Sequence, residues 1–264
     1  MKLYVCIVSH GHAALVMDSL PAFLGLNSIT VCVVDNLGES TLRGYCESHS
    51  VFYAPPLSIA CGFGANNNRG FRLLAEHFSV RDEDYFICCN PDVKISREGL
   101  LLLHEELLRY RPSLASVNLF RNAEMSELDP NVRFFPRLSD YVARVLKRGR
   151  GSLINRESYE FPVYCDWAAG SFLIITSSLY IALRGFDERY FMYFEDVDLC
   201  LRARRQESAR LLYLPQVKAV HAGAFQNRNL LSKHFSWYLR SFLRYFFRFY
   251  FAGTIPKRQI EEVQ

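Results

Sequence analysis

The stretch Tyr85–Val93, which reads YFICCNPDV, shows the pattern that decides the fold. Its first five residues form a continuous apolar run, as expected of a parallel strand that is buried on both faces of a sheet. Asn90 and Asp92 follow this run directly. A carboxylate at the end of such a strand is well placed to hold a divalent cation against a diphosphate, and the alternative is a plain Asn-Pro turn.

Two earlier stretches repeat this pattern. Leu3–Val8 (LYVCIV) and Ile29–Val34 (ITVCVV) are continuous apolar runs, and a helix is expected after each. The polar residues that follow them are Ser9, His10, Asp35 and Asn36. Alternating strands and helices predict an open α/β sheet, in which ligands bind at the carboxyl ends of the strands. There Asp35 is placed either to contact a nucleotide or to fill a turn or cap role, with neither favoured, and His10 taken alone is more typical of a loop histidine than of a nucleotide contact.

A glycine-rich segment opens the next helix. Residues 62–70 read GFGANNNRG and lack the GK[ST] ending of a phosphate-binding Walker loop. Asn is unfavourable inside helices, so the triple Asn at positions 66–68 suggests contacts to a polar ligand as well as capping. Asn67 and Asn68, together with Gly62 before them, are therefore candidates for binding a polar ligand.

The stretch Tyr190–Arg202, YFMYFEDVDLCLR, carries a catalytic signal. Five large apolar or aromatic residues precede Glu195, Asp196 and Asp198, and the segment then turns helical. A carboxylate against aromatic walls has a reason to hold a raised pKa, which suits a general base, although a helix dipole alone also favours acids in a first turn. We assign Glu195 and Asp196 mainly to chemistry. Asp198 is assigned mainly to structure, as the partner of Arg202 in a surface ion pair that contributes about 0.2–0.5 kcal/mol.

The last part of the chain is basic and aromatic. The 264-residue chain has a net charge of +4, yet residues 208–260 contain no acid and nine Lys or Arg residues. A helix is expected from about Asn229 to Phe251, in which Arg240, Arg244 and Arg248 repeat at i,i+4 and share one face. This pattern is typical of a nucleic-acid site and equally suits an interfacial membrane helix. No apolar run has the 18 or more residues that a membrane-spanning helix needs.

Two short strands, Leu211–Leu214 and Val217–His221, are expected before this helix. His221 by itself is typical of a structural histidine, but with Asp92 and a diphosphate it would complete a Mg²⁺ or Mn²⁺ site. The eight cysteines include no CxxC pair, which favours a reducing compartment over a disulfide framework.

Seven motifs in order resemble the family-two glycosyltransferases of the GT-A fold. They are SHGH, VVDN, GFGANNNRG, CNPDV, DWAAGSF, GFDERYFMYFEDVDLCLR and KAVHAG, and SKHFSWYLRSFLRYF follows them. They are most similar to the rhamnosyltransferases of bacterial O-antigen synthesis, from about Val5 to the end of the chain. The resemblance implies an α/β fold with a mixed, mostly parallel sheet flanked by helices and a C-terminal basic aromatic helix. It also implies a nucleoside-diphosphate sugar donor, a divalent cation and inversion by direct displacement.

The resemblance assigns roles to single residues. Asp35 is expected at the base or ribose, Asp196 is expected to be the catalytic base with Glu195 beside it, and Asp92 and His221 are expected at the metal. The donor-binding candidates are Ser9, His10, Asp35, Asn36, Gly62, Asn67, Asn68, Asn90 and Asp92. The acceptor-binding candidates are Trp167, Gly170, Ser171 and Tyr193. Because Asn90 stands where the usual DxD motif has its first Asp, Asp92 is the one carboxylate ligand expected for Mg²⁺ or Mn²⁺.

The implied activity is transfer of L-rhamnose from dTDP-L-rhamnose to a GlcNAc-diphosphate-polyprenol in O-antigen and lipopolysaccharide synthesis. Residues 1–227 are expected to form the catalytic domain, with a donor half to about residue 120 and an acceptor half beyond it. Residues 228–264 are expected to lie on an anionic surface at the cytoplasmic face of the bacterial inner membrane, and no nucleic-acid partner is expected.

Three alternatives remain. The first is another nucleotide-sugar transferase of cell-surface polysaccharide synthesis, and the second is a non-catalytic membrane-associated scaffold on the same fold. The third, another nucleotide-using α/β enzyme, is disfavoured because no glycine-rich phosphate loop follows the first strand.

Overall fold

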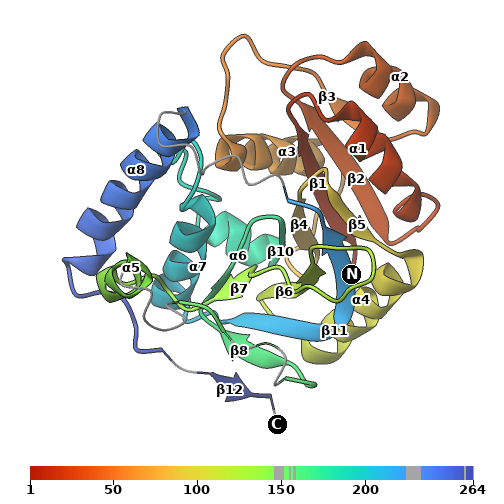
Figure 1. Ribbon diagram of the computed structural model, residues 1–264. Coiled ribbons are helices and arrows are strands. Elements are labelled where there is room, and N and C mark those ends of the chain that lie inside the picture. The colour runs from red at the N-terminus through yellow and green to blue at the C-terminus, as the bar shows by residue number, and fades with distance from the viewer. Residues whose placement is uncertain (146–151, 155, 157–158, 224–232, 259, 264) are drawn as a thin grey trace.

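The computed structural model describes the chain except residues 146–151, 155, 157–158, 224–232, 259 and 264 (Figure 1). Its centre is a sheet in which ten strands of the described chain take part, in the order β12-β8-β11-β6-β10-β4-β1-β2-β3, with β5 beside β11. These strands are β1 (Leu3–Ser9), β2 (Ile29–Asp35), β3 (Phe52–Ala54), β4 (Tyr85–Cys89), β5 (Val93–Ile95), β6 (Leu114–Phe120), β8 (Val163–Cys165), β10 (Phe172–Thr176), β11 (Leu211–His221) and β12 (Glu261–Glu262). A separate pair is formed by β7 (Val132–Arg133) and β9 (Trp167–Ala168).

The N-terminal half of the sheet is parallel. β1 is buried along its whole length and pairs in parallel with both β2 and β4, and β2 pairs in parallel with β3. β10 runs antiparallel to its neighbours β4 and β6, while β11 is parallel to β6. The expected mixed sheet is confirmed, and the carboxyl ends of β1, β2 and β4 lie at one edge.

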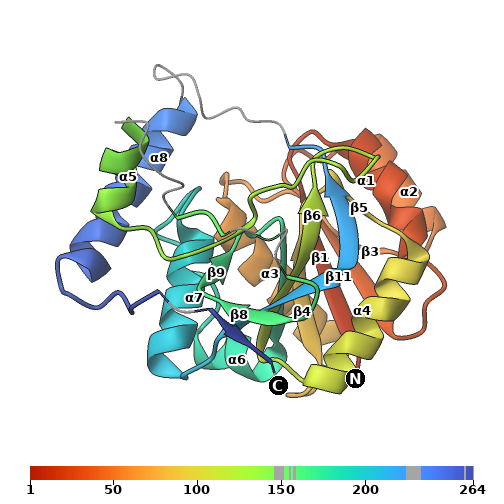
Figure 2. The same ribbon diagram turned by 60° about the horizontal axis from the view of Figure 1, so that its bottom comes forward.

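Helices cover both faces of this sheet, and each face has its own apolar core (Figures 1 and 2). α1, α2 and α4 pack on one face, and α3, α6 and α7 pack on the other. The helical segments are α1 (Ala13–Ser19), η1 (Leu20–Ala22), α2 (Ser40–Ser48), α3 (Phe63–His77), α4 (Arg97–Tyr110), α5 (Leu138–Val145), α6 (Ser177–Ala182), α7 (Glu195–Gln206), α8 (Lys233–Tyr245) and η4 (Phe246–Tyr250).

The late strands differ from the prediction. The two short strands expected at residues 211–214 and 217–221 form one strand, β11, whose pairing with β6 shifts register between Leu214 and Lys218. Pro215 lies in this irregularity, and proline has no N–H group to give to a ladder. The run of apolar residues is interrupted there, but the strand continues to His221.

The expected C-terminal helix is present over the residues that the structure describes. α8 starts at Lys233 and continues as one π-helical turn, η4, to Tyr250. The first four residues of the predicted helix, 229–232, lie outside the described residues. After η4 the chain returns to the sheet, where β12 pairs with β8. The division of the chain at residue 227 stays a prediction.

Candidate active site

The acidic loop, which we define as Tyr190–Phe194, leads directly into helix α7. Tyr193 and Phe194 have φ values of +71° and +66°, and Phe194 is an N-cap residue whose side chain makes no capping bond. Left-handed backbone at a non-glycine residue costs roughly 1–3 kcal/mol and persists only where the surroundings hold it. Two such residues in succession, immediately before the acids, mark this loop as a candidate functional site.

Asp196 is the acid that the loop brings to the edge of the sheet. The backbone N–H of Gly170 donates to its Oδ2 at 3.0 Å, and the N–H of Val197 donates to its Oδ1 at 2.8 Å. Burial raises the pKa of Asp196, although these two N–H groups and the charge of Arg133 act against the rise. A carboxylate has about four acceptor positions, so Asp196 retains free lone pairs that can take a proton.

Glu195, one residue earlier, is only 6% exposed. Its Oε2 has no hydrogen-bond partner within the described part of the chain. Burial and the neighbouring charge of Asp196 raise the pKa of Glu195 well above its usual value. The two adjacent acids therefore differ, because the protein backbone holds Asp196 while one oxygen of Glu195 is left unbound.

Asp198, the third acid, was expected in a surface ion pair, and that expectation is wrong. Asp198 is fully buried, and Arg202 is 8% exposed in its side chain and donates Nε to Asp198 Oδ2 at 2.6 Å. The same guanidinium donates to the carbonyls of Leu183 and Gly185, and Arg248 pairs with the other oxygen of Asp198 at 3.0 Å. Asp198 is structural, as predicted, but in a buried network.

The acidic loop rests on the start of α3. The backbone N–H of Phe63 donates to the carbonyl of Phe191 at 3.1 Å. A Cβ atom at Gly62 would lie 1.9 Å from that carbonyl oxygen, and one at Gly170 would lie 2.7 Å from the Phe63 ring. A side chain is therefore excluded at Gly62 by the backbone of the acidic loop, and one at Gly170 would require the Phe63 ring to move.

The asparagines lie inside helix α3 and are buried. Asn67 donates Nδ2 to the carbonyl of Phe63, and its Oδ1 has no partner among the described residues. Asn68 donates to the Phe186 carbonyl and accepts bonds from the Tyr180 hydroxyl and the Phe186 N–H. Asn68 thus fastens α3 to the segment before the acidic loop, and donor contacts by either residue stay predictions.

The carboxyl ends of β1 and β2 carry the first group of candidates. Asp35 is fully buried and accepts bonds from three backbone N–H groups of the following turn and from the Tyr53 hydroxyl at 2.9 Å. This is the turn role that the sequence left open, and a nucleotide contact stays a prediction. Ser9 is buried, Asn36 is half-buried and His10 is exposed.

Asp92 and His221 meet at the end of β4. Asp92 Oδ1 lies 3.5 Å from His221 Nε2, and Asp92 Oδ2 accepts the N–H of Gly223 at 3.0 Å. Asn90 Nδ2 lies 3.4 Å from the same His221 nitrogen, and Asp129 Oδ2 lies 3.2 Å from the other, Nδ1. Burial acts to lower the pKa of His221, but the hydrogen bond to Asp129 and the charge of Asp92 raise it overall.

The acceptor candidates lie between these groups. Trp167 is buried and donates its indole N–H to the carbonyl of Phe134 at 2.8 Å. Ser171 is buried, its hydroxyl has no partner within the described residues, and its carbonyl accepts the Asn90 N–H at 2.9 Å. Tyr193 is half-buried in the acidic loop. Acceptor contacts by these residues stay predictions.

The structure brings four predicted segments together, namely residues 62–68, 90–92, 167–171 and 190–196, through the backbone bonds described above. The β1 and β2 ends adjoin them, because β4 pairs with β1. Asp129 was not identified from the sequence as a partner of His221. It lies 92 residues from His221, so spacing gave no signal.

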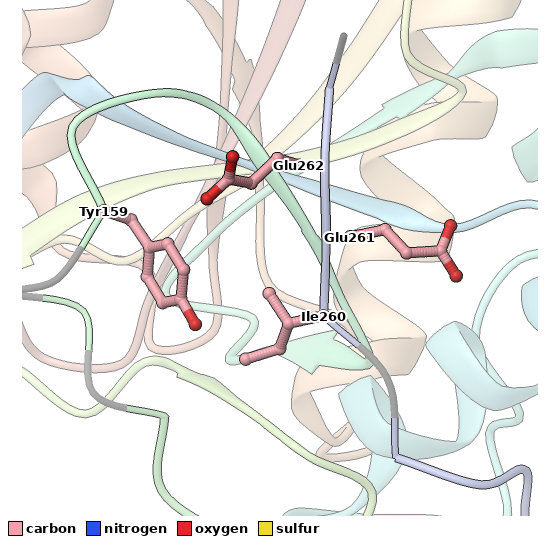
Figure 3. A pocket seen from close by; sticks show the side chains of 4 residues that line it. All are labelled: Tyr159, Ile260, Glu261 and Glu262. Carbon is pink, nitrogen blue, oxygen red and sulfur yellow. The ribbon is translucent and has the colours of Figure 1, made fainter.

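No three His, Cys, Asp or Glu side chains of the described residues are grouped closely enough to hold a metal ion by themselves. Asp92 and His221 fit a divalent cation in their chemistry if a bound diphosphate supplies the remaining oxygen ligands. A surface hollow of about 670 Å³ is lined by Tyr159, Ile260, Glu261 and Glu262 (Figure 3). None of these four residues belongs to the candidate site.

Comparison with known proteins identifies the family. No protein-family profile matches the chain. The chain is 34% identical over 250 residues to rhamnosyltransferase WbbL of Escherichia coli K12, a match covering 93% of each protein. It is 30% identical over 179 residues to an N-acetylglucosaminyl-diphospho-decaprenol L-rhamnosyltransferase of Mycobacterium tuberculosis, covering 63% of this chain and 57% of that protein.

Solved structures agree with this in fold. GalNAc-T7 with UDP, GalNAc and Mn²⁺ has a TM-score of 0.65 at 12% identity, and the match covers 95% of this chain and 49% of that one. Staphylococcus aureus TarS 1–349 with UDP-GlcNAc has a TM-score of 0.57 at 14% identity, covering 90% and 64%. The chain belongs to the rhamnosyltransferase family that includes WbbL, and it is a glycosyltransferase of the GT-A fold.

Proposed function

We propose that this glycosyltransferase moves L-rhamnose from dTDP-L-rhamnose onto a GlcNAc-diphosphate-polyprenol, with inversion at the sugar carbon, in O-antigen synthesis. The observation that carries this proposal is the position of Asp196, which the Gly170 N–H holds beside the sheet edge where the donor candidates gather. The names of the two rhamnosyltransferase relatives support the sugar, and the mycobacterial name supports the acceptor.

The residues support a single displacement. Asp196 accepts the proton of the acceptor hydroxyl while that oxygen bonds to the sugar carbon and the bond from this carbon to the diphosphate breaks. The products are the glycoside, the nucleoside diphosphate and protonated Asp196, so atoms and charge balance. A positioned base contributes typically 10²–10⁴-fold to such a reaction. Glu195 lies next to this base, and we expect it to position the reacting groups rather than to take the proton. One of its oxygens has no partner among the described residues.

Asp92 and His221 are the residues that would hold Mg²⁺ or Mn²⁺ against the donor diphosphate. Such an ion supplies positive charge that offsets the charge developing on the leaving diphosphate. The Gly223 N–H donates to Asp92 Oδ2, and the other oxygen, Oδ1, lies 3.5 Å from His221 Nε2.

A panel of nucleotide sugars, each offered with a short-chain GlcNAc-diphosphate-lipid and read by mass spectrometry, tests the substrate proposal. We expect a product heavier by one deoxyhexose with dTDP-L-rhamnose, and none when the acceptor is a polyprenyl phosphate without GlcNAc. A product with a different nucleotide sugar alone would favour another transferase of cell-surface polysaccharide synthesis. The absence of both transfer and donor hydrolysis across the panel would favour the scaffold alternative.

We also propose that the enzyme is peripheral at the cytoplasmic face of the inner membrane, on an exposed stripe of the C-terminal helix. The stripe consists of Leu239, Leu243, Phe247 and Phe251, which are spaced at i,i+4 and 43–68% exposed. Arg240 is exposed beside it, whereas Arg248 is turned to Asp187 and Asp198, with which it forms ion pairs. No helix in the described part of the chain is long and apolar enough to cross a membrane.

The double change Leu243→Glu and Phe247→Glu tests this surface. It should release the protein from anionic liposomes in a sedimentation assay, and it should lower activity on a long-chain lipid acceptor while sparing a short-chain one. A matched control is Leu101→Glu with Leu108→Glu, two exposed leucines of α4. Equal losses on both acceptors, or liposome binding that persists, would contradict the membrane proposal.

A further inference from the structure

Helix α8 contacts the acidic loop residue by residue. Ser241, which is 4% exposed, donates its hydroxyl to the carbonyl of Met192 at 2.9 Å. The Tyr193 hydroxyl lies 3.1 Å from His234 Nδ1. These two hydrogen bonds join consecutive residues of the loop to residues 41–49 positions later in the chain.

Aromatic contacts surround these two bonds. The Phe191 ring packs against Trp237 with the ring centres 4.7 Å apart. Phe194, which is 6% exposed, packs against Tyr238 and Tyr245 at 5.6 and 5.3 Å. Every residue from 191 to 194 therefore has a partner on α8.

The same element also reaches helix α7, through the turn η4 that continues α8. Arg248 of this turn donates to Asp198 Oδ1 at 3.0 Å and to Asp187 Oδ2 at 2.7 Å. Asp198 lies in the first turn of α7, with Glu195 and Asp196. The C-terminal element thus holds the segment on both sides of the two candidate catalytic acids.

The backbone geometry explains why such support is needed. Tyr193 and Phe194 both have left-handed backbone, which non-glycine residues keep only when neighbouring contacts outweigh the local cost. A small relaxation of Phe194 would turn the first residues of α7 and move the carboxylates, since Phe194 is the N-cap residue. A displacement of about 1 Å at a catalytic group can lower a rate about 100-fold.

We propose that α8 is a positioning element for the active site, in which Ser241 and His234 hold the acidic loop in its left-handed conformation and thereby set the position of Glu195 and Asp196. This inference rests on the proposed function only in taking these two acids as the catalytic ones. It gives the basic aromatic helix a role within the catalytic unit, besides the exposed stripe on its other side.

Ser241→Ala tests this role, with Ser236→Ala as the matched control. Ser236 is on the same helix but is exposed, and its hydroxyl donates to the carbonyl of Lys233 within the helix. Removing the Ser241 hydroxyl leaves the carbonyl of the half-buried Met192 without this donor. We expect kcat to fall about tenfold with the donor KM unchanged, and Ser236→Ala to match the parent. Equal kcat in both variants, or a loss confined to donor KM, would overturn the proposal.

A second pair of variants guards against a simple loss of stability. His234→Phe keeps an aromatic ring on α8 but removes the bond to the Tyr193 hydroxyl, and Tyr193→Phe removes the same bond from the other side. The reduction in kcat caused by His234→Phe should disappear in the Tyr193→Phe background, because the bond is already absent there. The same reduction in both backgrounds would show that His234 does not act through Tyr193.

Hydrogen exchange gives a readout that needs no activity. The peptide covering residues 190–198 should exchange faster in Ser241→Ala than in the parent or in Ser236→Ala, since the loop would open more often. If the enzyme transfers no sugar, the proposed function fails while this measurement still tests the contact. Unchanged exchange in Ser241→Ala would overturn the proposed support of the loop.

Discussion

Two buried carboxylates in this molecule, Asp35 at the end of β2 and Glu195 at the start of α7, have opposite surroundings. Asp35 receives three backbone N–H groups and the Tyr53 hydroxyl. Glu195 keeps an oxygen without a partner in the described structure, and burial raises its pKa. A buried carboxylate that is saturated with hydrogen bonds stabilises a fold, whereas one left unsaturated lowers stability and is a candidate for function.

The largest effect that follows from this comparison is on stability, at Asp35. Asp35→Ala removes the acceptor of three N–H groups and one hydroxyl, so it should lower the free energy of unfolding by about 3 kcal/mol. That corresponds to a Tm lower by roughly 6–12 °C for a chain of this size. Urea unfolding measures the loss, with Asp18→Ala, at an exposed surface ion pair, as the control. A stability equal to the control, with a loss only in nucleotide binding, would assign Asp35 to the donor instead.

Asp92 is intermediate between Asp35 and Glu195 in its hydrogen bonding. One of its oxygens accepts the N–H of Gly223, while the other lies 3.5 Å from His221 Nε2. Asp92→Ala should weaken binding of the nucleoside diphosphate about tenfold, equal to about 1.4 kcal/mol. It should also remove any gain in affinity from Mg²⁺ or Mn²⁺, and His221→Ala should do so in part. Calorimetric titration with and without Mn²⁺ measures both effects. Full activity of the parent enzyme in excess chelator would show that the metal assignment is wrong.

The smallest effect is a gain in stability at Glu195. Because its folded pKa is raised, the folded state binds more protons than the unfolded state, and the stability that Glu195 contributes is lost as pH rises through the folded pKa. Glu195→Gln cannot ionise, so it should be more stable than the parent at neutral pH, with the difference vanishing near pH 4. Urea unfolding at both pH values measures this. A variant less stable than the parent at neutral pH would show that the Glu195 carboxylate stabilises the fold, as that of Asp35 does.

The sheet could be predicted from the sequence because its central strands are uninterrupted apolar runs. β1 and β4 are buried along their whole lengths, as such runs require. The break at Pro215 was overestimated, since a missing N–H interrupts a ladder locally without ending the strand. Helix spacing likewise predicted the pair of Asp198 and Arg202 but not its burial, which depends on the packing of α6 and η4 around it.

The rest of the site depends on contacts between distant parts of the chain. The acids were found because their residue types and aromatic neighbours are unusual, but nothing local indicates that the Gly170 N–H holds Asp196. The aromatic residues of α8 were interpreted as part of a membrane surface because they are interleaved with Arg240, Arg244 and Arg248, which share one face. The structure divides them between the acidic loop, where Phe194 is covered, and the exposed stripe that includes Phe247.

The central claim is that Asp196 is the base of a sugar transfer, and single-turnover transfer by Asp196→Asn tests it most directly. With dTDP-L-rhamnose and a short-chain GlcNAc-diphosphate-lipid, we expect the rate of the chemical step to fall 10²–10⁴-fold, because the acceptor hydroxyl loses its proton acceptor. Donor binding should stay within about twofold of the parent, since the lost interaction acts in the transition state. A transfer rate within a few-fold of the parent, with donor binding unchanged, would contradict the claim.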